Sequence, residues 1–183
     1  MSKKLLIKNV KKMKNLLPIL FACFMFLLSP QLTNAQTNIV QNSGFEQGQA
    51  FWVFSPTSTV SYGDGCFGAQ RANAELVPNS SNITPEISQN ITIPSSGISQ
   101  LALSIKSDVF SSSGQVIVEF KAGSVLIASV TFGTAGQFGC TERFATLPAA
   151  NFDSYRNQNV TLNIRTANTS GSPVYHIDRV RVF

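Results

Sequence analysis

Apolar and polar residues alternate along most of the chain after Gln36, which is typical of strands that bury one face. The clearest examples lie at residues 101–106, 116–121 and 160–165. The same alternation predicts further strands at Ala69–Leu76, Ile87–Ile93, Val125–Phe132, Phe138–Leu147 and Val174–Phe183. A helical period does not persist for three turns anywhere in this part of the sequence.

Loop signals rich in Pro, Gly, Ser and Asn separate the predicted strands, as at residues 77–82, 94–97, 111–114 and 168–173. About nine or ten short strands with polar turns bury their apolar sides best when two sheets pack face to face. The sequence therefore predicts an all-β, antiparallel two-sheet sandwich. Several long connections favour a jelly roll over a simple meander.

The first 35 residues have the composition of a secretory signal peptide. Six lysines precede an apolar run from Leu16 to Leu28, and the small residues Thr33 and Ala35 follow it. We therefore expect cleavage after Ala35 and export to the periplasm or the cell exterior. The remaining residues, 36–183, have the length of a single domain.

Two other interpretations of this leader are weaker. A lipid anchor at Cys23 would require the apolar run to end there, but the run continues to Leu28, and Phe21 is bulky for a lipidation motif. An uncleaved membrane anchor is disfavoured because the run is shorter than the roughly 20 residues of an ordinary span.

Cleavage would also reverse the net charge. Six of the 14 Lys and Arg precede Gln36 and all nine Asp and Glu follow it, which leaves eight basic against nine acidic residues and a net charge of −1. The basic charge of the whole chain thus belongs to its leader and is no argument for nucleic-acid binding. We expect no nucleic-acid partner, and no membrane association after cleavage.

Two cysteines follow the leader, Cys66 and Cys140. An exported chain meets an oxidising compartment, so a disulfide between them is the main prediction. The alternative, two free thiols or a metal pair, lacks the neighbouring His or Cys ligands that zinc needs.

The segment Val40–Trp52 combines residues suited to a core with glycines suited to a turn. Glu46 lies in this segment, at the end of the expected first strand. If the first and last strands are neighbours, Glu46 and Asp178 meet, and with a carbonyl of Gly44 or Gln47 they form the oxygen cluster that calcium prefers. The alternative is that Asp178 pairs with Arg179, Arg181 or a backbone amide.

Three motifs resemble carbohydrate-binding modules of the CenC-like, galactose-binding-like jelly-roll type. They are Asn42–Gly48 with Trp52, the middle segments Ile87–Pro94 and Leu101–Ser107, and the ending Ile177–Val182. Residues 152–162 are also similar to the stretch before the penultimate strand of adhesion-type jelly rolls in secreted bacterial proteins.

The resemblance implies a structural calcium at the positions of Glu46 and Asp178, and a packed core position for Trp52. Arg179 departs from the family pattern, since a second acidic residue or Asn is frequent there. The resemblance implies binding of a polysaccharide or glycan.

Aromatic residues gather between Phe51 and Phe67. Sugars stack their apolar C–H faces on aromatic rings, and nearby polar groups take their hydroxyls. Tyr62 and Phe67, expected on a loop, and Arg71 beside them are therefore the predicted ligand contacts.

Catalysis has little support in the sequence. His176 is the only histidine, its strand position favours a packed side chain, and no Gly-x-Ser-x-Gly motif is present. A non-catalytic, secreted carbohydrate-binding protein is the leading hypothesis. The alternatives are an adhesion or matrix domain that binds a cell-surface protein or itself and, less favoured, a small hydrolase that uses His176.

Overall fold

Ten strands and one short helix form the described part of the structure, a computed structural model that places residues 37–63, 66, 71–78, 84–108, 114–134, 139–167 and 173–183. The strands are β1 Val53–Phe54, β2 Ser58–Tyr62, β3 Ala72–Leu76, β4 Glu86–Thr92, β5 Gln100–Ser107, β6 Gln115–Ala122, β7 Val125–Gly133, β8 Thr141–Thr146, β9 Asn159–Ala167 and β10 Tyr175–Val182. The helix η1, Ala149–Tyr155, is a short 3₁₀ helix. No helix among these residues is long and apolar enough to cross a membrane. The predicted signal peptide, residues 1–35, lies outside the described residues.

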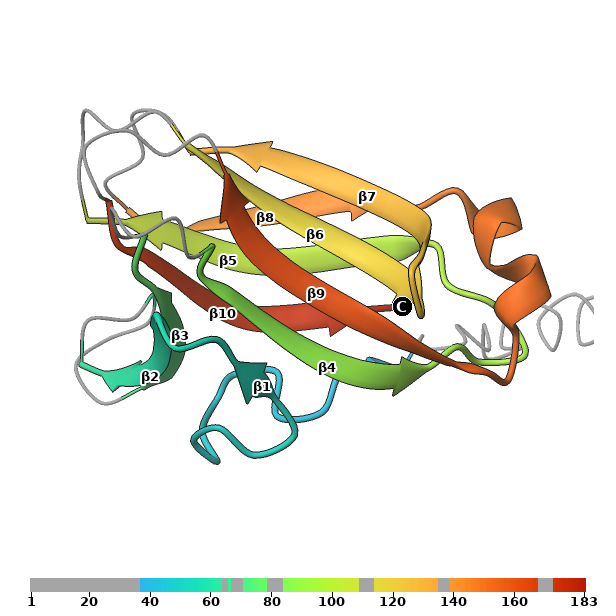
Figure 1. Cartoon of the computed structure of the whole chain (residues 1–183), viewed down its shortest axis with the longest axis horizontal. Coiled ribbons are helices and arrows are strands. Elements are labelled where there is room, and N and C mark those ends of the chain that lie inside the picture. Colours follow the sequence, from blue (N-terminus) through green and yellow to red (C-terminus); the bar gives the residue numbers. More distant parts are fainter. Residues whose placement is uncertain are drawn as a thin grey trace, which may run out of the picture. The chain divides into compact units, whose positions relative to one another are not determined.

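The strands form two five-stranded antiparallel sheets (Figure 1). The first sheet has the order β1-β4-β9-β6-β7 and the second has the order β2-β3-β10-β5-β8. Neighbours within a sheet are mostly distant in sequence, as when β10 lies between β3 and β5. The predicted all-β two-sheet sandwich is confirmed.

Alternation along each strand explains why the sheets pack against each other. In β9, the side chains of Val160, Leu162 and Ile164 are buried in the shared core, so Thr161 and Asn163 point to the outer face. The same rule applies to β6, where Val118 and Phe120 lie in the core. The outer face of each sheet is therefore formed by the polar half of the pattern.

The eight strands predicted after residue 68 correspond to β3 to β10, with ends shifted by a few residues. Three elements were not predicted. β1 has two residues, β2 has only Val60 as an apolar residue in its middle, and η1 buries only Phe152. Such short or mostly polar segments carry too little periodicity to be recognised.

The expectation that Glu46 ends a first strand is wrong, because residues 41–51 form turns. Asn42 and Phe45 have positive φ angles of 45° and 58°, which extended strands do not allow. Phe45 keeps this costly conformation because its ring is fully buried, with its centroid 5.2 Å from that of Trp52. Trp52 is itself buried, as predicted.

The opening segment nevertheless lies beside the last strand. The amide of Ile39 donates to the carbonyl of Val182 at 3.1 Å, and the amide of Val180 donates to the carbonyl of Ser43 at 3.0 Å. Asn38 adds a side-chain bond, since its Oδ1 accepts from the amide of Val182. These contacts bring the two ends of the domain together, as the metal hypothesis required.

One close contact restricts the core at the start of β10. The hydroxyl of Tyr175, a fully buried residue, accepts a hydrogen bond from Thr134 Oγ1 at 3.2 Å. A Cβ atom added to Gly114 would lie only 1.8 Å from the same hydroxyl oxygen. Glycine is therefore required at position 114 while Tyr175 is present.

The predicted disulfide joins Cys66 to Cys140 in the structure. The bond closes a loop with a sequence separation of 74 residues and links the segment before β3 to the segment before β8. In the second sheet β10 and β5 lie between β3 and β8, so the bond joins connections that lead to strands that are not neighbours.

Replacing both cysteines, Cys66→Ser with Cys140→Ser, should lower the free energy of unfolding by up to about 4 kcal/mol, because the unfolded chain regains the entropy of an open loop. Guanidinium unfolding with and without a reducing agent measures the effect. The reductant should destabilise the wild type and leave the double variant unchanged. Equal stability of the wild type and the double variant without a reducing agent would show that the disulfide is dispensable.

Candidate functional site

The structure brings Gly44, Glu46 and Asp178 together where the opening segment meets the middle of β10, the central strand of the second sheet. A Cβ atom on Gly44 would lie 3.5 Å from Asp178 Oδ1 and 3.8 Å from Glu46 Cγ. A bulge in β10 shifts its pairing with β5 between Asp178 and Arg181, and Arg179 has a φ of 49°. The bulge changes the direction of the strand next to Asp178, where the opening segment crosses it.

Asp178 is an unusual carboxylate because it is only 3% exposed. Burial raises the pKa of Asp178 to about 6, and the negative charge of Glu46 adds to the increase. The amide of Arg179 donates to Oδ1 at 2.6 Å, and this bond together with the charges of Arg179 and Arg71 works in the opposite direction. Of the alternatives considered for Asp178, the backbone amide is observed, whereas Arg181 pairs with Glu142.

The oxygen atoms of Gly44, Glu46 and Asp178 are ligands that suit a hard cation. Two carboxylates and the backbone carbonyl of Gly44 supply only oxygen, which calcium prefers, and a buried carboxylate gains most from a counter-charge. No group of three or more His, Cys, Asp or Glu side chains is found in the described ranges. Carbonyl oxygens and water would therefore have to complete a shell of six to eight ligands.

The predicted ligand contacts are only partly described. Tyr62 is 63% exposed, but it is the last residue of β2 rather than part of a loop. Its hydroxyl lies 3.7 Å from a Cβ placed on Gly48, and Arg71 is exposed before β3. Tyr62 therefore lies beside the opening segment, and the charge of Arg71 acts on Asp178. Phe67 lies outside the described residues.

His176 is buried with a partner on each ring nitrogen. Nδ1 lies 2.8 Å from Asn73 Oδ1, and Nε2 lies 2.9 Å from Asp108 Oδ2. Asp108 also pairs with Lys106 at 3.2 Å. Since both nitrogens are engaged, His176 has none available to take a proton from a hydroxyl nucleophile. The prediction of a packed histidine is confirmed.

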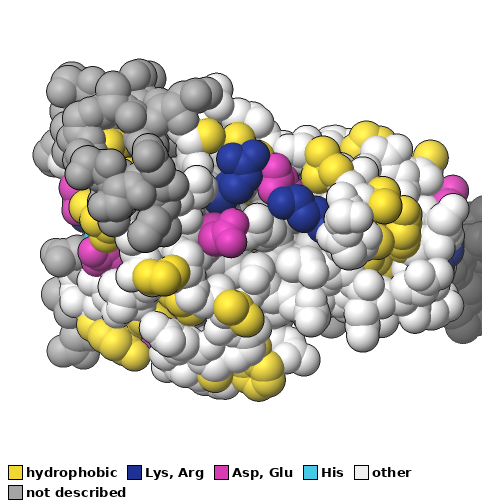
Figure 2. Space-filling view, viewed as in Figure 1, with side chains coloured by type: hydrophobic (Ala, Val, Ile, Leu, Met, Phe, Trp, Pro, Cys, Tyr) yellow, Lys and Arg dark blue, Asp and Glu magenta, His cyan; other side chains and the backbone are white. Residues whose placement is uncertain are grey.

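A second polar site lies on the outer face of the first sheet, where acidic and basic side chains gather (Figure 2). It consists of Glu86 on β4, Glu119 and Lys121 on β6, and Asn163 and Arg165 on β9. We call these five residues the Glu119 cluster. Sequence analysis did not identify it, because its members come from three strands and meet only through the pairing of the sheet.

Glu119 is the centre of this cluster. Its Oε1 accepts from Arg165 Nη2 at 2.8 Å, and its Oε2 lies 2.6 Å from Lys121 Nζ. Although it is on an outer face, Glu119 is only 7% exposed. The hydrogen bond from Arg165, opposed by burial and aided by Lys121, lowers the pKa of Glu119 to about 2.

Asn163 has one atom that the described protein does not satisfy. The register places Asn163 between Ser88 of β4 and Glu119 of β6. Its Nδ2 donates to Glu86 Oε2 at 3.3 Å, whereas its buried Oδ1 has no hydrogen-bond partner within the described ranges. The residue is 6% exposed, so this acceptor is costly unless something donates to it.

No protein-family model and no curated protein sequence matches the chain. Its fold does match solved structures. One is TmCBM61 in complex with β-1,4-galactotriose, with a TM-score of 0.60, 15% identity, and coverage of 81% of this chain and 99% of that one. Another is a family 16 carbohydrate-binding module, with a TM-score of 0.55, 10% identity, and coverage of 80% and 99%.

Enzymes share the fold as well. A Stig cyclase, Fisc, from Fischerella sp. TAU matches with a TM-score of 0.58 at 16% identity, over 79% of this chain and 95% of that one. The protein is thus a two-sheet jelly roll of the kind found in carbohydrate-binding modules. This agrees with the resemblance in sequence at the level of the fold.

Protonation of Glu119 should destabilise the fold. Because its folded pKa lies below the unfolded value of 4.5, its contribution is complete above about pH 5.5 and is lost as the pH falls toward 2. The shift corresponds to at most about 3 kcal/mol. Urea unfolding between pH 3 and 7 should show that Glu119→Gln is less stable than the wild type at pH 7 and loses less stability on acidification.

The exposed pair of Asp153 with Arg156 provides the control, since Asp153 is more than half exposed. Asp153→Asn should retain the acid dependence of the wild type. Parallel curves for the wild type and Glu119→Gln would contradict the assignment.

Proposed function

We propose that this protein is a secreted, non-catalytic carbohydrate-binding protein that holds a polysaccharide or surface glycan at the Glu119 cluster. The observation that carries the proposal is the buried Oδ1 of Asn163, an acceptor without a protein donor beside a fixed guanidinium and carboxylate. The fold shared with carbohydrate-binding modules, one of them solved with β-1,4-galactotriose, supports the class of ligand.

The chemistry of the cluster suits neighbouring sugar hydroxyls. Each hydroxyl both donates and accepts, so one can accept from Arg165 while its neighbour donates to Asn163 Oδ1, an atom that the side chains around it must uncover for the ligand. The guanidinium has five N–H donors, and one of them is directed at Glu119. Ion pairing holds Arg165 and Lys121 in place before a ligand arrives, which reduces the entropy cost of binding.

Tyr62 and Arg71, with Phe67, are proposed as further glycan contacts. Tyr62 ends β2 and Arg71 precedes β3, so these two belong to the second sheet and its connections and not to the face that carries Asn163. A long polymer could touch both regions, whereas a short oligosaccharide would occupy one. The engaged nitrogens of His176 support a non-catalytic role.

Export is supported by the disulfide and by the leader. A cytosolic chain would rarely keep the Cys66–Cys140 bond, since reducing agents there open such bonds. We propose cleavage after Ala35, and we propose that Gly44, Glu46 and Asp178 bind a structural calcium ion.

Glycan binding is tested by titrating the protein with the trisaccharides of β-1,4-galactan, cellulose and xylan and by co-sedimentation with the insoluble polymers. Asn163→Ala should weaken binding roughly ten-fold or more, because a fully desolvated hydrogen bond is worth about 1–3 kcal/mol. Thr92→Ala, an exposed position at the end of the same sheet face, should bind like the wild type. Unchanged affinity in Asn163→Ala would remove the cluster from the binding site.

Calcium should raise the melting temperature of the wild type at pH 7 above its value in EDTA, by an amount that corresponds to about 2.7 kcal/mol when calcium is at 100 times its dissociation constant. Asp178→Asn and Glu46→Gln should lose this response, because each removes a carboxylate ligand. Asp153→Asn should keep it. The same melting temperature in calcium and EDTA would show that Gly44, Glu46 and Asp178 bind no calcium.

A further inference from the structure

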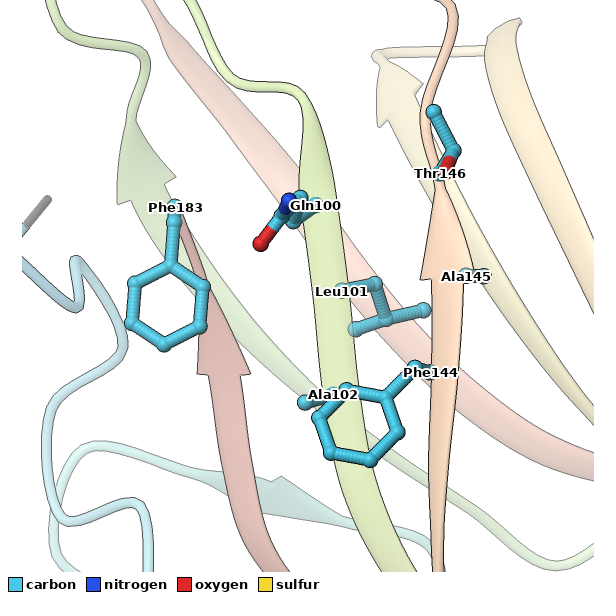
Figure 3. A pocket seen from close by; sticks show the side chains of 7 residues that line it. All are labelled: Gln100, Leu101, Ala102, Phe144, Ala145, Thr146 and Phe183. Atoms are coloured by element: carbon cyan, nitrogen blue, oxygen red, sulfur yellow. The ribbon is translucent and has the colours of Figure 1, made fainter.

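A small hollow lies on the outer face of the second sheet, opposite in direction to the Glu119 cluster (Figure 3). Its volume is about 190 Å³. The side chains that form it are Gln100 and Ala102 on β5, Phe144 and Thr146 on β8, and Phe183 after β10. We call it the Phe144 hollow.

The register of three strands produces this hollow. Gln100 lies between Thr146 of β8 and Phe183, with which it exchanges backbone hydrogen bonds. In the next row, Ala102 lies beside Phe144. The ring of Phe144 reaches from β8 across β5 and lies in front of Ala102 (Figure 3), whose side chain is only 1% exposed.

The two rings differ in their environment. Phe144 is 68% exposed, the highest value among the exposed aromatic side chains of the described residues. Phe183 is half-buried, and the guanidinium of Arg181 lies 5.9 Å from its ring centre. Arg181 is in turn held by Glu142. One wall of the hollow is therefore fixed, and the other presents an open aromatic face.

We infer that the Phe144 hollow is a second carbohydrate site, which takes one sugar ring against the face of Phe144. The apolar C–H face of the ring would stack on Phe144, and its hydroxyls would meet the amide of Gln100 and the hydroxyl of Thr146. The inference rests on the proposed function for the class of ligand. With sites on opposite faces, one molecule would bridge two glycan chains.

The dimensions favour a sugar over a second protein. The hollow is smaller than the roughly 300–1,000 Å³ of pockets for larger ligands, so it fits one ring that remains partly in solvent. A stable dimer buries about 800 Å² on each partner. Among the other large exposed apolar side chains of the described residues, Val53, Val125 and Leu126 lie on the first sheet, and Tyr62 lies on β2, at the edge of the second sheet opposite β8, so these four cannot extend this patch.

Backbone NMR during titration with β-1,4-galactotriose, cellotriose and xylotriose separates the two sites. We expect the amides of Gln100, Ala102 and Thr146 to shift in the wild type. Phe144→Ala should weaken this response at least ten-fold. Leu126→Ala, which truncates an exposed apolar residue on β7, should respond like the wild type.

Each outcome decides a different point. Shifts only near Asn163 would overturn the second site and leave the proposed function intact. Shifts only around Phe144 that persist in Asn163→Ala would support the hollow and reject the Glu119 cluster. No shift at the hollow with any of the three sugars would overturn the inference. A Phe144→Ala variant that changes only the sedimentation of the protein would overturn it as well, because that result indicates self-association through Phe144.

Bridging gives an independent readout. The wild type should cross-link soluble β-1,4-galactan, or the polymer of whichever trisaccharide binds, and make its solution turbid. Phe144→Ala and Asn163→Ala should each still bind the polymer in affinity electrophoresis but should not raise the turbidity. Full turbidity with Phe144→Ala would contradict a second site at the hollow.

Discussion

Burial of alternate side chains between two five-stranded sheets is the constraint on which the rest of this molecule depends. The side chains that alternate with the buried ones along each strand must therefore point outward. The packing also makes segments neighbours that are distant in the sequence. Asn163 meets Glu119 only because β9 pairs with β6, and Ala102 meets Phe144 only because β5 pairs with β8. The Glu119 cluster and the Phe144 hollow are thus products of strand pairing.

Strand positions were largely predictable from the sequence because alternation is a local signal. Residues 101–106 and 160–165 needed no knowledge of their partners to be recognised as half-buried strands. The opening segment was misjudged for the opposite reason. Its apolar residues suggested a strand, yet Phe45 reaches the core from a turn and has a positive φ angle. The packing of its ring against Trp52 offsets the cost of this backbone conformation.

The candidate sites also differ in how far they could be predicted from the sequence. The proximity of Glu46 to Asp178 was predictable because motifs at both ends of the chain resembled one family. The Glu119 cluster was not, since Glu119, Asn163 and Arg165 are ordinary outward polar residues until the register is known. Arg179 shows how backbone conformation relates to the residue type at one position. Its φ of 49° at the bulge lies in the left-handed region, which Asn and Asp adopt more readily than Arg, and the modules that the sequence resembles often have an acidic residue or Asn at this position.

The contact between Tyr175 and Gly114 limits how this domain can diverge. The oxygen of Tyr175 occupies the space that any side chain at position 114 would need, and the ring carbon that bears it lies only 3.0 Å away from that space. If the hydroxyl alone were lost, the ring would still have to shift by a few tenths of an ångström. Sequence drift must therefore follow an order at these two positions, with the hydroxyl lost before the glycine can be exchanged.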